Sequence, residues 1–370
     1  MRILFAGMVA GVPGHGGATW AILQYVLGLA RLGHEVAVAE PVRELAAPSE
    51  AYFGEVTDAF GLDGCAALLV EATGETAGMS YEALRDFAPH AGLLVNVNGM
   101  LRDPALTESI PIRLYLDLDP VFNQLWAEQG IDVGLDGHTH FATVGLGIGR
   151  QGATLPTGGR SWITTVQPVV LTEWPFATET RWEGLTTVGN WRSYGSPEKD
   201  GVRYGQKAHS FRSFFELPRR TDVPVSASLT IHGDEQADLA ALGANGCTLL
   251  DPAETGGTPD RYRRFVQGSW AELGIAKEGY VVSGSGWFSD RSVCYLASGR
   301  PVLAQETGYS AFLPTGDGLL PFATIDDLLG GIELLRAGYP RHRRAARALA
   351  EDLFDSDTVL TRLLDAVGAG

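Results

Sequence analysis

Cysteine is nearly absent from this chain: its 370 residues include only Cys65, Cys247 and Cys294. An odd number of widely spaced cysteines argues against a disulfide framework and against a zinc site. We therefore expect the protein to work in a reducing compartment and to be cytoplasmic.

Long apolar runs are also missing. No segment reaches the roughly 18 to 20 continuous apolar residues that a membrane-spanning helix needs, so we expect no transmembrane segment. Residues 1–7 carry one charge and lead directly into a Gly/Pro-rich loop, without the apolar core and cleavage site of a signal peptide. We interpret residues 2–7 as a first buried β-strand.

Positive charge is in deficit. The chain has 28 Lys and Arg against 44 Asp and Glu, which gives a formal net charge of −16. The electrostatic field of this negative charge repels polyanions unless the basic residues are gathered on one face, so we expect no nucleic-acid partner. The one dense basic run, residues 341–344, begins a late helix and is interpreted as a solvated helix face.

The remaining composition is that of a globular protein, with 45% apolar and 19% charged residues. Single hydrophobic cores stop growing near about 250 to 300 residues, so a chain of this length is expected to form two lobes with a cleft between them. The sequence leaves the oligomeric state, including a homodimer, undetermined.

The N-terminal region has the pattern of a β-loop-α-β unit. The first strand leads into a loop that contains Gly14, Gly16 and Gly17, whose small size lets the backbone approach a ligand. Residues 18–32 are apolar on most faces, as in a helix buried against a sheet, and residues 35–39 form the next strand. This unit is typical of the start of a parallel doubly wound sheet.

Short apolar runs continue in two series. The first series is predicted at residues 66–70, 92–97, 112–118 and 162–171, followed by a linker at 172–184. The second is predicted at residues 186–190, 225–231, 247–250, 279–282, 302–304 and 319–322, with helices that include 204–215 and 259–273. We predict two Rossmann-like domains, residues 1–178 and 185–352, and a terminal helix in 353–370 that packs back on the first domain.

The most informative segment is Ser-Gly-Ser-Gly-Trp-Phe-Ser-Asp-Arg-Ser at residues 283–292, which we interpret as a turn between a strand and the helix at 293–297. Ligands of open α/β sheets bind where strands lead into helix N-termini. The backbone amides of this turn, the hydroxyls of Ser289 and Ser292 and the guanidinium of Arg291 suit a diphosphate. Because these groups supply positive charge, we expect no metal cofactor.

Residues 297–308, Ala-Ser-Gly-Arg-Pro-Val-Leu-Ala-Gln-Glu-Thr-Gly, resemble the donor-binding half of GT-B glycosyltransferases. The resemblance extends to Arg192 and Lys207, which are similar to the phosphate-binding Arg and Lys of that group, and to the N-terminal glycine loop. It implies a two-Rossmann fold and metal-independent transfer of a sugar from a nucleotide-diphosphate sugar to a small-molecule or glycan acceptor.

The same resemblance implies roles for the donor loop. Asp290 or Glu306 is expected to accept hydrogen bonds from sugar hydroxyls, beside Thr307 and Gly308. Many retaining members carry two glutamates eight positions apart in this region, whereas this chain has Gly286 and Cys294 at the equivalent places. The stereochemical outcome of the transfer is therefore left open.

Two histidines are predicted catalytic residues. His15 lies in the glycine loop, where inverting GT-B enzymes have a comparable histidine, and an imidazole can take a hydroxyl proton near neutral pH. His140 shares a predicted strand face with His138 and is similar to the first-lobe histidine that retaining relatives present to the donor sugar. Core packing is the alternative for this pair.

Other functions stay open at this point. The Asp117-Leu118-Asp119 sequence has the Asp-x-Asp pattern of a metal site, but Pro120 follows it directly and we interpret it as a helix entry. Glu40 would suit a nicotinamide-dependent oxidoreductase, although the glycine loop does not fit Gly-x-Gly-x-x-Gly. A nucleotide-sugar epimerase and a non-catalytic sugar-nucleotide-binding relative are the remaining alternatives.

Overall fold

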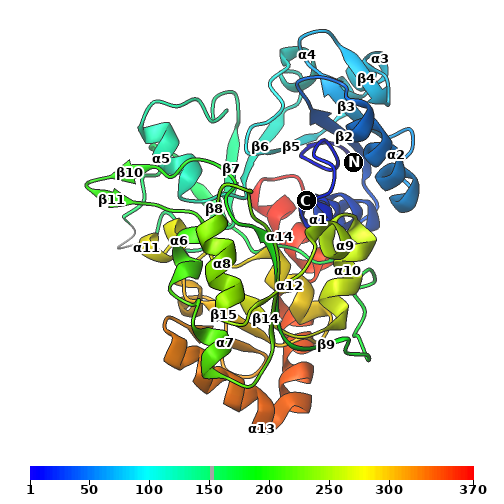
Figure 1. The fold of residues 1–370 in the computed structure, drawn as a ribbon. Helices are drawn as coiled ribbons and strands as arrows, with labels where there is room; N and C mark the ends of the chain where they lie inside the picture. The colour runs from blue at the N-terminus through cyan, green and yellow to red at the C-terminus, as the bar shows by residue number, and fades with distance from the viewer. Residues whose placement is uncertain (151–153) are drawn as a thin grey trace.

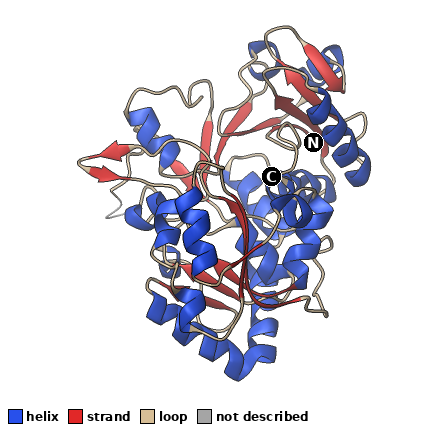
Figure 2. Ribbon diagram, in the orientation of Figure 1, coloured by secondary structure: helices blue, strands red, loops and turns tan. Residues whose placement is uncertain are grey.

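The computed structural model describes residues 1–150 and 154–370. They form two lobes, each built on a mainly parallel sheet with helices packed on it (Figures 1 and 2). The predicted fold class, two Rossmann-like doubly wound units, is confirmed.

The first sheet has the strand order β4-β3-β2-β1-β5-β6-β7-β8 and is parallel except for β4. Its strands are β1 (Arg2–Ala6), β2 (Glu35–Pro41), β3 (Ala66–Val70), β4 (Glu75–Gly78), β5 (Leu93–Val97), β6 (Ile112–Asp117), β7 (His140–Thr143) and β8 (Trp162–Thr164). Its helices are α1 (Gly16–Arg31), α2 (Ala47–Phe60), α3 (Tyr81–Phe87), α4 (Pro104–Thr107) and α5 (Phe122–Glu128). Both faces are covered: in β1, Ile3 and Phe5 belong to one hydrophobic cluster and Leu4 and Ala6 to another. This two-sided burial explains the continuous apolar runs.

The second sheet is entirely parallel, in the order β13-β12-β9-β14-β15-β16. Its strands are β9 (Trp182–Asn190), β12 (Val225–Thr230), β13 (Thr248–Leu249), β14 (Ser269–Gly274), β15 (Val302–Gln305) and β16 (Leu319–Phe322), and a small hairpin is formed by β10 (Glu198–Lys199) and β11 (Val202–Arg203). Its helices are α6 (Lys207–Arg212), α7 (Leu217–Arg220), α8 (Gln236–Ala244), α9 (Pro252–Gly256), α10 (Pro259–Gly268), α11 (Glu278–Ser283), α12 (Asp290–Ala297) and α13 (Ile325–Leu349).

The last helix, α14 (Ser356–Ala366), packs on α1 of the first lobe, as Figure 1 shows in red. Gly28 of α1 makes this contact close, because a Cβ atom there would lie 2.5 Å from Leu360. The chain thus crosses between the lobes twice, and the two crossings pair: the Val169 amide donates to the Phe354 carbonyl at 2.7 Å, and the Ser356 amide donates to the Val169 carbonyl at 2.9 Å.

Three sequence-based boundaries are wrong. The predicted strand at residues 279–282 belongs to the helix α11, and the last third of the predicted helix at 259–273 belongs to the central strand β14. β14 carries Glu272, a charged residue that interrupts its apolar pattern and is nevertheless fully buried. The predicted strand at 162–171 is limited to β8, since the chain leaves the sheet there to cross to the second lobe.

Candidate functional site

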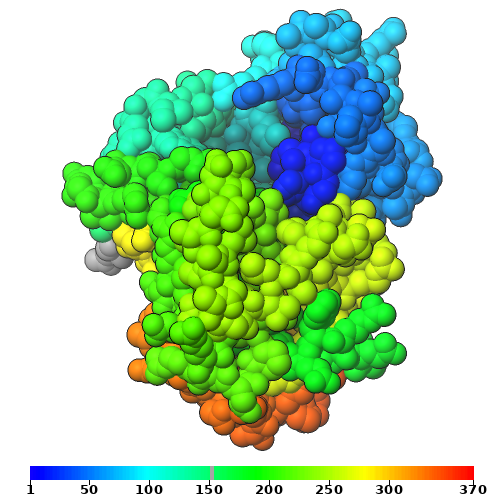
Figure 3. All heavy atoms as spheres, in the orientation of Figure 1, coloured from blue at the N-terminus to red at the C-terminus, as the bar shows by residue number. Residues whose placement is uncertain are grey.

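A cavity of about 380 Å³ lies between the lobes, at the carboxyl ends of the strands of both sheets. Figure 3 shows the molecular surface hollowed where the two lobes meet. The first lobe contributes the loops after β1, β5 and β6 and the start of α1, and the second contributes the ends of β9 and β12 and the starts of α6, α11 and α12. A volume of this order fits a small-molecule ligand.

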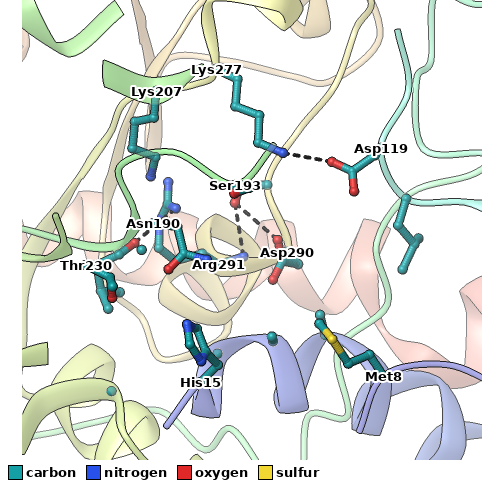
Figure 4. A pocket seen from close by; sticks show the side chains of 18 of the residues that line it. Met8, His15, Asp119, Asn190, Ser193, Lys207, Thr230, Lys277, Asp290 and Arg291 are labelled. Atoms are coloured by element: carbon teal, nitrogen blue, oxygen red, sulfur yellow. Dashed lines mark hydrogen bonds and ion pairs between the residues drawn. The ribbon is translucent and has the colours of Figure 1, made fainter. Parts of the chain in front are cut away.

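Two cations converge on one point of this cavity (Figure 4). Gly189 is the last but one residue of β9 and has a φ of +149°, and a Cβ atom on it would lie 3.1 Å from Nζ of Lys207 and 3.6 Å from Nη1 of Arg291. Lys207 is buried, and no described side chain makes a hydrogen bond or ion pair with its ammonium group. Burial, and next the charge of Arg291, lower the pKa of Lys207 well below its usual value. A bound anion would remove this penalty.

Arg291 is held from behind by a buried acid. Its Nε donates to Oε1 of Glu272 at 2.5 Å, and its Nη1 donates to the carbonyl of Val188 at 3.2 Å. Burial alone would lower the pKa of Arg291, but Glu272 outweighs it and the net shift is upward, so the guanidinium stays charged. The ion pair fixes the orientation of Arg291. No local pattern predicts Glu272 as its partner, because the two residues are 19 positions apart.

The helix α12 begins at the cavity wall. Ser289 is its N-cap and accepts a hydrogen bond from the Arg291 amide at 3.2 Å, and Ser289 and Asp290 both line the cavity. Ser292 is buried one residue further along the helix and is not among the lining residues. The free amides and the dipole of α12 therefore add positive potential close to Lys207 and Arg291. Of this predicted group the structure brings together Ser289, Asp290 and Arg291.

The glycine loop of the first lobe faces the same cavity. Gly14 and Gly17 line it, whereas Gly16 serves lobe packing, because a Cβ atom there would meet the Thr258 carbonyl of the second lobe at 2.2 Å. Glu40 clamps the loop from below: its carboxylate accepts hydrogen bonds from the amides of residues 9, 10 and 11 at 2.7 to 2.8 Å. A nicotinamide ribose would need this acid free, so the geometry does not favour the oxidoreductase.

The two predicted catalytic histidines lie in different places. His15 points into the cavity (Figure 4), and its Nδ1 lies 3.1 Å from the Pro13 carbonyl. If Nδ1 carries the proton that this contact requires, Nε2 is left with a free lone pair. His140 begins β7 opposite Leu114, at the amino end of the strand, and does not line the cavity. Parallel strands point their carboxyl ends at the cleft, so this placement argues against a catalytic role for His140.

The other predicted donor residues lie behind or beside the cavity. Arg192 is exposed and forms an ion pair with Glu235 outside it. Glu306 accepts a hydrogen bond from the Gly308 amide at 2.6 Å, and Thr307 donates to the Trp287 carbonyl at 2.5 Å. Thr307 thus holds its loop against Trp287, whereas Glu306 stabilises its own loop, and Glu306, Thr307 and Gly308 do not line the cavity.

Sequence reasoning missed a polar cluster at the end of β6. Asp119, which we had interpreted as part of a helix entry, binds Lys277 of the second lobe at 2.8 Å, and both line the cavity. The rarity of lysine could have pointed to Lys277: only three of the 28 basic residues are lysines, and two of these, Lys207 and Lys277, line this cavity. Lysine and arginine are not interchangeable where a compact charge is needed.

The Asp-x-Asp pattern does not form a shared site. Asp117 is buried and accepts hydrogen bonds from Asn123, Gln124 and Thr143, while Asp119 is engaged by Lys277. In the part of the chain that the structure describes, no three His, Cys, Asp or Glu side chains are arranged to hold a metal ion. Within the same part, no helix combines the length and apolarity needed to cross a membrane.

Comparison with known proteins identifies the fold. Neither a protein-family model nor a curated protein matches the sequence. An α-glucosyltransferase in complex with UDP-glucose and DNA containing an abasic site matches with a TM-score of 0.66 and 12% identity, over 100% of this chain and 99% of its own. The Anabaena protein HepE in complex with UDP-glucose matches with a TM-score of 0.62 and 12% identity, over 100% of both chains.

The fold is GT-B. This confirms the resemblance drawn from residues 297–308 and from the glycine loop. At 12% identity the likeness concerns the fold, so the chemistry of the site must be argued from this chain's own residues.

The prediction that nucleic acid is not a partner is wrong. Structures with this fold include α-glucosyltransferase bound to a 13-mer DNA that contains an HMU base. Our prediction used the net charge of −16, which sums over the whole chain. A polyanion responds to the local field of the face that it meets, and a net charge does not record how charges are distributed over the surface.

Proposed function

We propose that this protein is a glycosyltransferase that moves a hexose from a nucleotide-diphosphate sugar to an acceptor hydroxyl. One observation carries the proposal: Lys207 and Arg291 meet within 4 Å of one point beneath Gly189, beside the first turn of α12. Two cations and free helix amides form a binding site for a diphosphate. The same groups can neutralise the leaving nucleoside diphosphate.

The choice of UDP as nucleotide is supported by the neighbours, because α-glucosyltransferase and HepE were both solved with UDP-glucose. We infer that the donor needs no divalent cation, since Lys207, Arg291 and α12 supply the positive charge that a metal would supply. Activity that persists in excess EDTA would agree with this, and activity restored only by Mg²⁺ or Mn²⁺ would contradict it. Use of a nucleotide sugar also supports the cytoplasm as the working compartment.

His15 is our proposed catalytic base. It lies on the first-lobe side of the cavity, opposite the cations, and an unprotonated Nε2 there can accept the proton of an attacking hydroxyl. His15→Ala should leave UDP affinity unchanged and lower kcat by about 100-fold or more. His90→Ala, at an exposed position outside the cavity, is the matched control.

The proposal is tested first by binding. Calorimetry and thermal shift with UDP, dTDP, GDP and NAD should show stabilisation by one nucleoside diphosphate and none by NAD. Hydrolysis of the matching nucleotide sugar without acceptor should follow, and the acceptor panel should include simple sugars, glycans and HMU-containing DNA. Stabilisation by NAD alone, or by no nucleotide, would refute the function. Binding without hydrolysis or transfer would favour the non-catalytic relative.

A further inference from the structure

Asp119, a residue of the first lobe, is held by hydrogen bonds from the second lobe. It follows β6 of the first lobe, and its Oδ1 accepts hydrogen bonds from Lys277 at 2.8 Å, Tyr194 at 2.5 Å and Tyr280 at 2.8 Å (Figure 4 shows the bond to Lys277). All three donors belong to the second lobe. The position of this carboxylate therefore depends on the lobes being closed on each other.

The second oxygen of Asp119 is free. No hydrogen bond to Oδ2 comes from any residue that the structure describes, although the side chain lines the cavity and is 28% exposed. In Figure 4 this oxygen points away from Lys277, into the space above Met8. An ionised carboxylate can accept about four hydrogen bonds, so Oδ2 is available to a ligand.

Asp119 is ionised because its partners outweigh its burial. Burial raises its pKa, but the charge of Lys277 and the hydrogen bonds from Lys277, Tyr194 and Tyr280 lower the pKa by more. The net pKa of Asp119 lies below the usual value. Lys277 is itself stabilised by the Tyr194 ring, whose centroid lies 4.1 Å from Nζ. Oδ2 is thus a hydrogen-bond acceptor and would repel a phosphate.

The turn that carries Asp119 is rigid and strained. Asn98, with a φ of +51°, accepts a hydrogen bond from the Leu118 amide at 3.1 Å, and buried Asp117 accepts one from the Asp119 amide at 3.1 Å. Val121 has a φ of +79°, a conformation that costs roughly 1 to 3 kcal/mol and is concentrated at functional sites. Both lobes therefore contribute to holding one carboxylate in place.

We propose that Oδ2 of Asp119 accepts a hydrogen bond from a hydroxyl of the hexose on the bound donor, and so helps to select that sugar. The inference rests on the proposed function. Lys207, Arg291 and α12 attract the diphosphate, and a carboxylate in the same small cavity must face the uncharged part of the donor. Lys277, Tyr194 and Tyr280 of the second lobe orient this carboxylate of the first lobe. Asp119 can therefore make the contact with the sugar only when the two lobes are closed on each other.

The test compares UDP-glucose with its monodeoxy analogues in donor hydrolysis. In the wild type, removing the hydroxyl that contacts Asp119 should lower kcat/KM about tenfold or more, the typical effect of losing a hydrogen bond to a charged group. In Asp119→Ala that analogue should be used as well as UDP-glucose, and UDP affinity should not change. Lys277→Met should weaken the same discrimination, and Asp132→Ala, at an exposed acid of the same lobe, should leave it intact.

Three outcomes would overturn the proposal: equal discrimination in the wild type and Asp119→Ala, a loss of UDP affinity equal to the loss of UDP-glucose affinity, or a defect in transfer without one in donor hydrolysis. The last would place the contact on the acceptor. Asp119→Asn replaces Asp119→Ala if that variant does not fold. It keeps the volume of the side chain but has only one acceptor oxygen, which Lys277, Tyr194 and Tyr280 engage, so the discrimination should be weakened in the same way. Failure of the wild type to bind UDP would instead refute the proposed function.

Discussion

Replacing Lys207 with methionine should stabilise the free protein and weaken its binding of UDP. Lys207 is buried and pairs with no acid among the residues that the structure describes, and burial followed by the charge of Arg291 lowers its pKa well below 10.5. The folded state therefore holds this proton less tightly than the unfolded chain. Lys207 costs stability at neutral pH, and the gain from methionine should shrink as the pH rises towards 10.5.

The loss of UDP binding can be estimated from the lost contact. A hydrogen bond from a charged group contributes about 1.5 to 3 kcal/mol, which corresponds to roughly 10- to 150-fold in Kd. At a UDP concentration 100 times the wild-type Kd, the wild type gains about 2.7 kcal/mol of stability. A variant that binds about 100-fold more weakly gains only about 0.4 kcal/mol under the same conditions.

Thermal shift with and without UDP measures both effects on the same samples. For domains of this size about 1 kcal/mol corresponds to roughly 2 to 4 °C, so the UDP-induced shift should fall from several degrees to about one. Lys199→Met is the matched control, because Lys199 pairs with Glu128 outside the cavity. An unchanged UDP shift in Lys207→Met, or a lower Tm of the free variant, would refute the reasoning.

Three further substitutions test how the lobes and the site are built. Gly16→Ala should destabilise the protein by about 1 to 3 kcal/mol in urea unfolding, because the new Cβ atom meets the second lobe at 2.2 Å. The control Gly54→Ala, at an exposed helical position, should stabilise the protein by about 0.5 to 1 kcal/mol. Equal effects of the two substitutions would contradict the close packing at Gly16. Glu272→Gln should cost about 3 to 5 kcal/mol, since it leaves the buried Arg291 without a counter-charge. A cost below about 1 kcal/mol would show that the ion pair is dispensable. Burial raises the pKa of Glu40 to about 7 despite three opposing backbone hydrogen bonds; the folded state therefore holds this proton more tightly than the unfolded chain, and the stability of the wild type relative to Glu40→Gln should fall as the pH rises from about 4.5 to about 7 and then level off. A flat difference across this range would contradict the assignment.

The sequence alone was sufficient for the local elements of the site. Apolar runs located most strands, the glycines after β1 located a cavity loop, and the helix predicted at residues 293–297 is α12, which begins three residues earlier, after its N-cap Ser289. These features depend on periodicity, backbone freedom and capping, which act over a few residues. The two-lobe fold followed from the order of the elements.

Only the tertiary structure decided which side chains share the cavity. Asp119 and Lys277 are 158 residues apart and on different lobes, so no local pattern could pair them. His140 was a good candidate by residue type, yet strand direction places it at the wrong end of β7. Which charged side chains meet across the cleft depends on how the two lobes pack. That packing results from many apolar contacts between residues far apart in the chain, which sequence spacing does not reveal.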